Sequence, residues 1–291
     1  MQELVVISGK GGTGKTSITA AFASLAQNLV IADCDVDAAN LHIILNPKTK
    51  KDVPFLCGKE AAINQQKCSG CNTCYNNCKF NAIKKDAQNK LYIDPLLCEG
   101  CGLCVILCPE KAIDFNPKLC GKILVSDTEL GDMIYAEMET GAENSGKLVS
   151  QVRTFAKNIA QEKHLDTIVV DGPPGTSCPA IASITGADKV LIVTEPTVSG
   201  LHDAIRVLEL TNHFKIPSFI CVNKWDINEE ITTNIEEEAQ KKGAIIAGRI
   251  SYNKNFNLSQ KKRQTIMEIC PKAAEEITLI WEKLYNLKIT K

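Results

Sequence analysis

The chain has 291 residues, a length that predicts two domains or one large domain with an insertion. Its 33 basic and 34 acidic residues nearly cancel, so the charge gives no indication of a nucleic-acid or anionic-membrane partner. The hydrophobic share of 44% and the charged share of 23% exclude wholesale disorder. No apolar run approaches the ~18–20 residues that span a bilayer, and residues 1–10 lack the basic start of a signal peptide. We therefore expect a cytoplasmic chain without stable membrane insertion.

Short apolar runs alternate with segments of helical periodicity through most of the chain. Strands are predicted at 3–8, 29–33, 166–171, 189–195, 218–224 and 244–250. Helices are predicted at 17–28, 147–163, 201–214 and 235–243. Strand alternating with helix predicts an α/β fold with a doubly wound, mostly parallel sheet covered by helices on both faces. A last helical pattern after residue 270 mixes glutamates and lysines on its polar face, which favours docking onto the core over binding a membrane surface.

Residues 54–121 do not follow this alternation. They are predicted to form a second domain inserted into the first, whose two parts are residues 1–53 and 122–291. The insert contains an internal repeat with a period of 30 residues, because Cys68, Gly70, Cys71, Cys74, Cys78, Ala82 and Ile83 recur as Cys98, Gly100, Cys101, Cys104, Cys108, Ala112 and Ile113. A duplicated unit with pseudo-twofold symmetry is therefore predicted, since each half is too short to bury a core of its own.

The segment Gly9–Thr16 follows a predicted strand, opens a predicted helix and has the form G-x-x-x-x-G-K-T. This is the context of a phosphate-binding loop, in which glycines let backbone N–H groups point at phosphate oxygens and the helix adds its positive end. In such a loop Lys15 reaches the β- and γ-phosphates, and the Thr16 hydroxyl binds Mg²⁺. The predicted nucleotide-binding residues of the loop are Gly9, Lys10, Gly11, Gly12, Thr13, Gly14, Lys15, Thr16 and Ser17.

An additional lysine, Lys10, gives the loop the form K-G-G-x-G-K-T, which resembles the deviant Walker A motif of the MinD, ParA and nitrogenase iron-protein family. The resemblance implies a P-loop ATPase that is slow and stimulated by its partner. It also implies a homodimer, or a heterodimer with a paralogue, that encloses nucleotide between its subunits. Lys10 is then expected to reach across to the phosphates of the other subunit, as an arginine finger supplied in trans does.

Carboxylates at two predicted strand ends extend the resemblance. Asp35, after the second strand, matches the residue of the family's first switch that orients the attacking water, and Asp33 lies nearer the Mg²⁺. Asp171, before the turn Gly172–Gly175, matches the Walker B aspartate that holds Mg²⁺ through water. The resemblance therefore implies catalytic roles for Lys10, Lys15 and Asp35, and a Mg²⁺ site formed by Thr16, Asp33 and Asp171.

Recognition of the base is predicted from Asn223, which follows another strand. In the MinD-like family an asparagine at this point contacts adenine. The residues Asn223–Asp226 are also similar to the N-K-x-D motif of GTPases, in which the aspartate reads guanine. The deviant loop favours ATP, and GTP stays open at this point.

Fourteen cysteines are unusual for a reducing compartment, where cysteines at regular spacing more often bind metal than form disulfides. Eight of them form two C-x2-C-x2-C-x3-C runs with the spacing of bacterial two-cluster ferredoxins, in which the fourth cysteine of each run ligates the other cluster. The predicted ligands are Cys68, Cys71, Cys74 and Cys108 for one [4Fe–4S] cluster, and Cys98, Cys101, Cys104 and Cys78 for the other. Zinc is the alternative, because four thiolates also suit tetrahedral Zn²⁺. Lys79 replaces the usual proline after Cys78, and its charge would raise the potential of a nearby cluster.

The six remaining cysteines have no ligand spacing among themselves and are predicted to be small buried hydrophobes. They are Cys34, Cys57, Cys120, Cys178, Cys221 and Cys270. Cys178 lies three residues beyond Gly175, and the alternative for it is a thiol that senses or accepts a cluster.

Together, the phosphate loop and the cysteine repeat resemble a MinD-superfamily subgroup that carries an inserted α+β domain like bacterial ferredoxin. The resemblance implies an ATP-hydrolysing, Mg²⁺-dependent protein whose nucleotide state is coupled to two [4Fe–4S] clusters. Its predicted role is electron transfer to a redox partner, or Fe–S or metal-cofactor assembly of a client protein. The alternative is a non-catalytic, redox-sensing ATP switch or a partitioning-type regulator. Quartets complete within one chain favour electron transfer, since a delivery scaffold is expected to hold its cluster by labile, subunit-bridging ligands.

Overall fold

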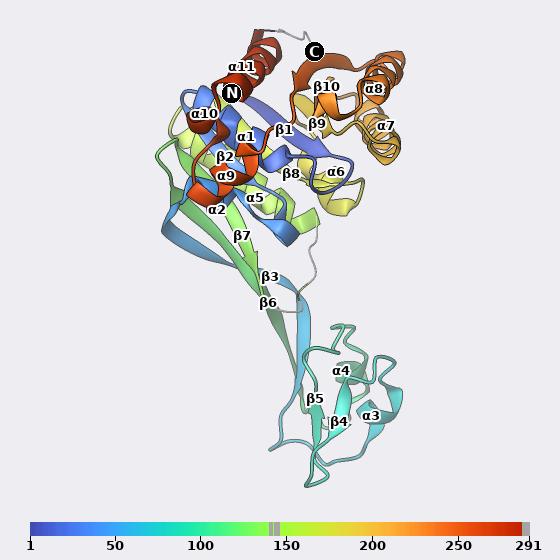
Figure 1. Ribbon diagram of the computed structural model, residues 1–291. Helices are drawn as coiled ribbons and strands as arrows, with labels where there is room; N and C mark the ends of the chain where they lie inside the picture. The colour runs from blue at the N-terminus through green and yellow to red at the C-terminus, as the bar shows by residue number, and fades with distance from the viewer. Residues whose placement is uncertain (140–141, 143–145, 287–291) are drawn as a thin grey trace. The chain divides into compact units, whose positions relative to one another are not determined.

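The computed structural model describes residues 1–139, 142 and 146–286. These residues form two compact units, each of which is considered by itself. The larger, called the sheet unit, contains Met1–Val53, Lys122–Met138 and the described residues from Gly146 onward (Figure 1). The smaller, called the cysteine unit, contains Pro54–Gly121 together with Glu139 and Ala142.

A nine-stranded sheet has the order β11-β10-β9-β1-β8-β2-β7-β6-β3. Its strands are β1 (Gln2–Ser8), β2 (Leu29–Asp33), β3 (Lys48–Ile63), β6 (Ile113–Asp127), β7 (Asp132–Met138), β8 (Thr167–Pro174), β9 (Lys189–Thr194), β10 (Ser218–Asn223) and β11 (Ile245–Ile250). The pairs from β11 through β7 are parallel, which confirms the mostly parallel α/β sheet. At its centre Val5 is in register with Val170 and Val190, and all three side chains are fully buried. Such burial on both faces explains why these strands are continuous apolar runs in the sequence.

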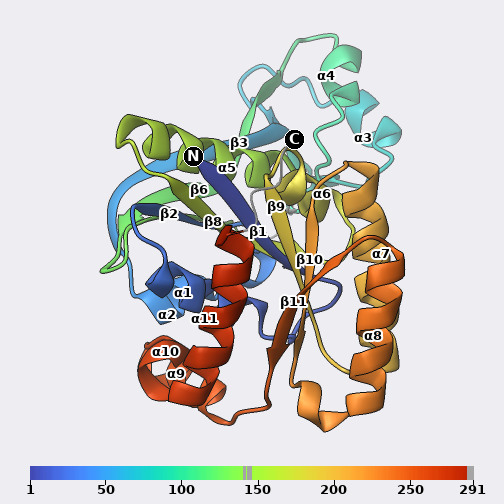
Figure 2. The same cartoon turned by 90° about the horizontal axis from the view of Figure 1, so that it is seen from above.

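Helices cover both faces of this sheet. They are α1 (Lys15–Leu25), α2 (Leu41–Leu45), α5 (Gly146–Glu162), α6 (Cys178–Ile184), α7 (Val198–His213), α8 (Glu229–Lys241), α9 (Asn255–Lys262), α10 (Ile266–Ile269) and α11 (Pro271–Asn286), with short 3₁₀ turns η1 (Val36–Ala38) and η2 (Trp225–Ile227). Figure 2 shows α1 and α11 on one face and α7 and α8 on the other. This two-sided arrangement is the doubly wound one predicted from the alternation of strand and helix.

The C-terminal helix α11 docks onto the core, as its mixed polar face predicts. Ile277, Ile280 and Leu284 are buried in the same cluster as residues of α1 and the sheet. The ring of Trp281 lies 5.2 Å from that of Phe22 on α1. Within the described residues, no helix is long and apolar enough to cross a membrane.

Three strands, β3, β6 and β7, were not expected from the sequence pattern. Most side chains of β3 and β6 are exposed or half-buried, so neither strand shows the apolar run or clean alternation on which a prediction depends. The segment 48–51 of β3 contains three lysines. Charged residues of this kind are usual on edge strands, and β3 is the last strand of the sheet.

The cysteine unit repeats its backbone at the offset seen in its sequence. It contains α3 (Thr73–Asn77), the antiparallel pair β4 (Ile83–Lys85) and β5 (Leu91–Ile93), and α4 (Leu103–Leu107). Left-handed φ angles recur 30 residues apart in three pairs, which are Gly70 and Gly100, Asn72 and Gly102, and Asn81 and Lys111. Both short helices therefore start from the same turn, and the halves are duplicates in conformation as well as in sequence.

Hydrogen bonds join the two halves of the cysteine unit reciprocally. The Asn64 N–H donates to the Ala112 carbonyl at 2.8 Å, and the Asp94 N–H donates to the Ala82 carbonyl at 2.7 Å. Each half thus pairs with the end of the other, as a pseudo-twofold axis requires. The small shared core consists of Ala61, Cys74, Ile83, Leu91 and Ile113.

Candidate functional site

The loop between β1 and α1 has the conformation that phosphate binding needs. Gly12 and Gly14 adopt φ angles of 81° and 90°, and no side chain caps the N-terminus of α1. The first N–H groups of the helix are therefore available to an anion. The Asn223 side-chain amide donates a hydrogen bond to the Thr13 carbonyl at 2.7 Å, which ties the loop to the end of β10.

Replacing Gly14 with Ala should destabilise this loop, because a Cβ there would lie 2.4 Å from Asn223 Nδ2 and the left-handed φ disfavours any side chain. We expect the free energy of unfolding to fall by about 1–3 kcal/mol. Gly11→Ala is the matched control, since no heavy atom lies within 4 Å of a Cβ at that position. Denaturant unfolding of both variants without nucleotide checks this, and equal losses would contradict it.

Lys15 lies in a buried cluster of opposite charges. Its Nζ is 2.8 Å from Asp171 Oδ1 and 3.1 Å from Asp35 Oδ2. The Thr16 hydroxyl donates to Asp171 Oδ2 at 2.7 Å, and the Thr19 hydroxyl donates to Asp171 Oδ1 at 3.1 Å. Burial opposes the charged lysine, but the carboxylates of Asp171 and Asp35 outweigh it and raise the pKa of Lys15. The structure thus brings together the phosphate-loop lysine, Thr16 and two of the three predicted carboxylates.

Asp33 has a different setting from the other two carboxylates. It is fully buried, and its oxygens accept the backbone N–H groups of Asp35 at 3.1 Å and Leu41 at 3.3 Å. Burial, followed by the nearby charge of Asp171, raises the pKa of Asp33 well above its usual range. Its carboxylate therefore fixes the turn after β2, behind the Asp35–Lys15–Asp171 cluster.

A cavity of about 510 Å³ opens beside the loop, a size suited to a nucleotide. The predicted residues that line it are Gly11, Gly12, Thr13, Gly14, Lys15, Thr16, Ser17, Asp35 and Asn223. Gly9, Lys10, Asp33 and Asp171 are not among the lining residues. Further lining residues, Lys224, Tyr252, Asn253, Phe256, Asn257 and Gln260, come from the end of β10 and from the segment after β11.

The aspartate of the N-K-x-D segment does not line the cavity. Asp226 Oδ1 accepts the backbone N–H of Tyr252 at 2.7 Å, and the Trp225 ring lies under the Arg249 guanidinium at 5.3 Å. A guanine-reading aspartate needs both carboxylate oxygens free for the base. Asp226 instead positions the segment after β11, which favours adenine over guanine as the base.

Asp226→Asn is expected to leave the preference between ATP and GTP unchanged, because the amide oxygen can still accept the Tyr252 N–H. Asn223→Ala, by contrast, should weaken binding of both nucleotides about tenfold by releasing the Thr13 carbonyl. Equilibrium titration of each variant with labelled ATP and GTP measures both effects. A selective loss of GTP binding in the Asp226 variant would show that guanine is the natural base.

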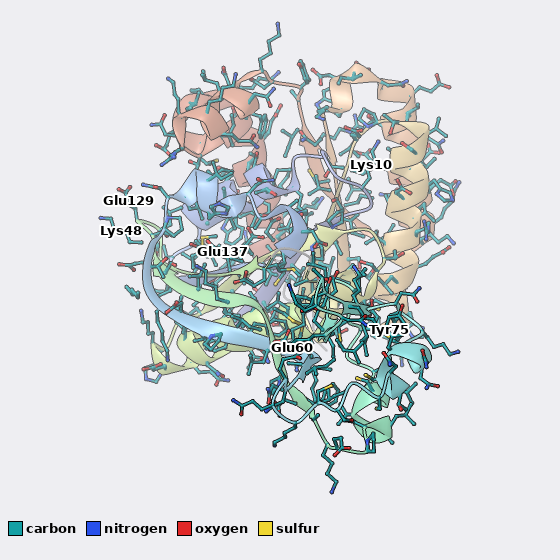
Figure 3. The ribbon with its side chains drawn as sticks, turned by 90° about the horizontal axis from the view of Figure 1, so that it is seen from below. Lys10, Lys48, Glu60, Tyr75, Glu129 and Glu137 are labelled. Carbon is teal, nitrogen blue, oxygen red and sulfur yellow. A yellow bond between two sulfur atoms is a disulfide. The ribbon has the colours of Figure 1, made fainter. Side chains whose placement is uncertain are left out.

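Lys10 does not line the cavity, and it makes contacts that could not be predicted from the sequence. Its Nζ lies 2.7 Å from Glu195 Oε1 and donates to the Ser199 hydroxyl at 3.0 Å (Lys10 is labelled in Figure 3). Lys224 Nζ lies 3.0 Å from Glu195 Oε2 and donates to the Gly12 carbonyl at 3.2 Å. Partial burial opposes the ionised carboxylate, but hydrogen bonds from both lysines lower the pKa of Glu195. One carboxylate therefore holds two cations beside the phosphate loop.

Comparison with known proteins agrees with this geometry. Residues 4–266 match the model of the CobQ/CobB/MinD/ParA nucleotide binding domain. The chain belongs to this family. It is 35% identical over 231 residues to an uncharacterized protein of Methanocaldococcus jannaschii, which covers 78% of this chain and 80% of that protein. Its fold is similar to that of the septum site-determining protein MinD of Pyrococcus horikoshii, solved with Mg-ADP, with a TM-score of 0.58, 16% identity and 99% of both chains covered.

A shorter stretch of this CobQ/CobB/MinD/ParA family member is similar to a protein of another kind. Over 53 residues it is 43% identical to the indolepyruvate oxidoreductase subunit IorA of Pyrococcus horikoshii. The match covers 18% of this chain and 8% of that protein.

The cysteine unit has two pockets, and each is lined by one of the predicted cysteine quartets. One pocket is lined by Cys68, Cys71, Cys74 and Cys108. The other is lined by Cys98, Cys101, Cys104 and Cys78, and Cys74 also borders it. Each pocket thus combines three cysteines of one run with the fourth of the other. Among the residues that the structure describes, no three His, Cys, Asp or Glu side chains are arranged to hold a single metal ion.

The six other cysteines divide into three groups. Cys34, Cys221 and Cys270 are buried as predicted, and burial raises the pKa of the Cys34 and Cys221 thiols. Cys178 is exposed, so the prediction of a buried hydrophobe is wrong for it. The prediction is also wrong for Cys57 and Cys120, which form a disulfide. Their 63-residue separation leaves no local spacing from which the pair could have been inferred.

Proposed function

We propose that this chain is an ATP-hydrolysing member of the MinD/ParA family whose nucleotide state is coupled to two [4Fe–4S] clusters. The observation that carries the proposal is that each of two pockets is lined by one complete predicted cysteine quartet, in a chain that also has a complete phosphate loop. Because a nucleotide site and two thiol pockets occur in one polypeptide, we infer that the bound nucleotide controls the centres held by the thiols.

The nucleotide half of the proposal rests on the charge cluster around Lys15. With nucleotide bound, the Lys15 ammonium would pair with phosphate oxygens, and Asp171 and Thr16 would hold Mg²⁺, which would neutralise phosphate charge. Asp33 keeps the adjacent turn in place. Asp35 lines the cavity, and we assign to it the role of orienting the attacking water. Lys10 acts on the second subunit of a homodimer or of a dimer with a paralogue.

The thiol half rests on the cysteines that line the two pockets of the cysteine unit. Four thiolates suit either a tetrahedral Zn²⁺ or a cubane, in which each iron takes one thiolate. The doubled C-x2-C-x2-C-x3-C spacing favours the cubane, because zinc sites usually use two separated C-x2-C pairs. The Cys68, Cys71, Cys74 and Cys108 pocket and its counterpart supply four thiols each. Clusters bound there would supply one-electron transfer, a role consistent with the 53-residue similarity to an oxidoreductase subunit.

Since both quartets are complete within the chain, we favour electron transfer to a redox partner over assembly of a client's cofactor. Anaerobic reconstitution should give about eight irons and eight sulfides per chain. The reduction potential should then shift when ATP is added. Eight irons without a shift would disprove the coupling, and release of clusters to an apo-acceptor on ATP addition would indicate delivery. A stable holo-protein without an EPR signal after dithionite reduction would disprove the redox role.

A second candidate is a non-catalytic ATP switch or a partitioning-type regulator. The contacts of Lys10 favour it, because Glu195 and Ser199 bind this lysine within its own subunit. A lysine kept in this way is suited to a switch that changes its partner when ATP binds. Turnover separates the two candidates: ATP-dependent dimerisation with no hydrolysis above background, even with reduced clusters, would identify the switch.

A further inference from the structure

We propose that Cys57 and Cys120 form a redox-active disulfide that exchanges two electrons with the centres held in the thiol pockets of the same unit. The inference rests on the proposed function, because it requires clusters in those pockets. It adds a two-electron thiol–disulfide site to a protein otherwise expected to carry only one-electron centres.

The pair lies across two neighbouring strands. Cys57 belongs to β3 and Cys120 to β6, which are adjacent in the sheet, and the Cα atoms of the two cysteines are 5.8 Å apart. Both residues belong to the cysteine unit. Cys120 is buried, whereas Cys57 is half-buried and its neighbours Leu56 and Gly58 are exposed. One sulfur is thus within reach of solvent protons while the other is shielded.

The rest of the chain argues against a purely structural role for this bond. All twelve other cysteines are free, and the eight of the thiol pockets must stay reduced to bind iron. A protein that keeps those thiols works in a reducing compartment, where disulfides are mostly transient, catalytic or redox-sensing. A disulfide in the same unit as eight such thiols is therefore expected to open and close during function.

The same two strands lead from the disulfide to both pockets. Cys57 precedes Ala61 by four residues on β3, and Ala61 lines the pocket of Cys98 and Cys104. Four residues of strand span about 13 Å. On β6, Ile113 lines the pocket of Cys68 and Cys108, seven residues before Cys120. Each cysteine of the disulfide thus belongs to a strand that forms the wall of one pocket.

The electron count matches as well. Reduction breaks the S–S bond, takes up two electrons and two protons, and leaves two thiols on Cys57 and Cys120. Two pockets that each hold a one-electron centre supply the two electrons, and solvent supplies the protons at the half-buried Cys57. Reoxidation of the dithiol returns two electrons to the oxidised centres and releases two protons.

Reductive titration of the holo-protein with dithionite, combined with mass spectrometry of alkylated thiols, tests the proposal. The wild-type chain should take up about four electrons, two in the clusters and two in the disulfide, and Cys57→Ser/Cys120→Ser should take up about two. Cys178→Ser, which removes an exposed free thiol, is the matched control and should keep the count at four. Cys57 and Cys120 should become alkylated only after the clusters have been reduced.

The alkylation measurement on the wild-type chain needs no variant, so it decides the question even if the double variant fails to fold. An iron-loaded protein that takes up two electrons while the pair resists alkylation would show a structural disulfide. A pair alkylated before any reductant is added would show two ordinary thiols. Either result would overturn this inference and leave the proposed function standing, whereas a chain that binds no iron on reconstitution would overturn both.

Discussion

Replacing Lys15 with Ala is expected to lower ATP hydrolysis by at least about 100-fold, the size of effect seen when one donor to the developing charge is removed. The substitution removes the ammonium that would meet the phosphates. It also leaves Asp171 and Asp35 without their cation, which costs about 3–5 kcal/mol of stability for a buried pair. Hydrolysis should therefore be measured alongside thermal unfolding with and without nucleotide.

Lys15→Arg is the control that distinguishes loss of activity from loss of folding in Lys15→Ala. The guanidinium keeps the positive charge between the two carboxylates, but its planar shape does not reproduce a compact ammonium against phosphate. We expect near-normal stability and strongly reduced turnover. Lys241→Ala, at an exposed position on α8, is the neutral control. Full hydrolysis by Lys15→Ala would contradict the ATPase assignment.

Pairs of cysteine substitutions should show which thiols share a cluster. If the fourth cysteine of each run crosses over, Cys78→Ser and Cys101→Ser remove ligands of the same cluster, so the double variant should keep about four irons. Cys78→Ser with Cys71→Ser removes one ligand from each cluster and should leave almost none. The lining of the pockets is compatible with the crossed arrangement, since Cys78 borders the pocket that contains Cys101.

Iron and sulfide analysis after anaerobic reconstitution measures this directly. The reverse pattern, with about four irons left by the Cys71 pair and none by the Cys101 pair, would mean that each run holds its own cluster. Cys178→Ser serves as the control, because its thiol is exposed and lines neither pocket. Eight irons in every variant would show that these cysteines are not ligands.

The strands that could be predicted from the sequence are the buried ones, because burial on both faces requires a continuous apolar run. Strands such as β1 and β10 are buried along most of their length, so they stand out as apolar runs between glycines and helices. β3 is long but mostly exposed, and β6 mixes buried and exposed residues without a regular alternation, so no periodicity marks either as a strand. The duplication of the cysteine unit could be predicted because the cysteines and Gly70 recur at one offset, whereas two of the three shared left-handed turns carry different residues in the two halves.

In the candidate site, too, features that are local in the sequence could be predicted, and features that depend on distant residues could not. The loop from Gly9 to Thr16 is local in sequence, so its conformation follows from its glycines and its flanking elements. Glu195, Lys224 and the Cys57–Cys120 bond depend on contacts between residues far apart in the chain. No spacing encodes such contacts. For Asp33 the sequence identified an important position, whereas only the structure shows that its carboxylate is occupied by backbone N–H groups.

The connection between α2 and β3 is very short. Ile43 and Ile44 of α2 line the nucleotide cavity, and β3 starts at Lys48, after only Asn46 and Pro47. Proline fixes its own φ, so this two-residue joint has little slack. We therefore expect the first residues of β3 to shift whenever α2 shifts.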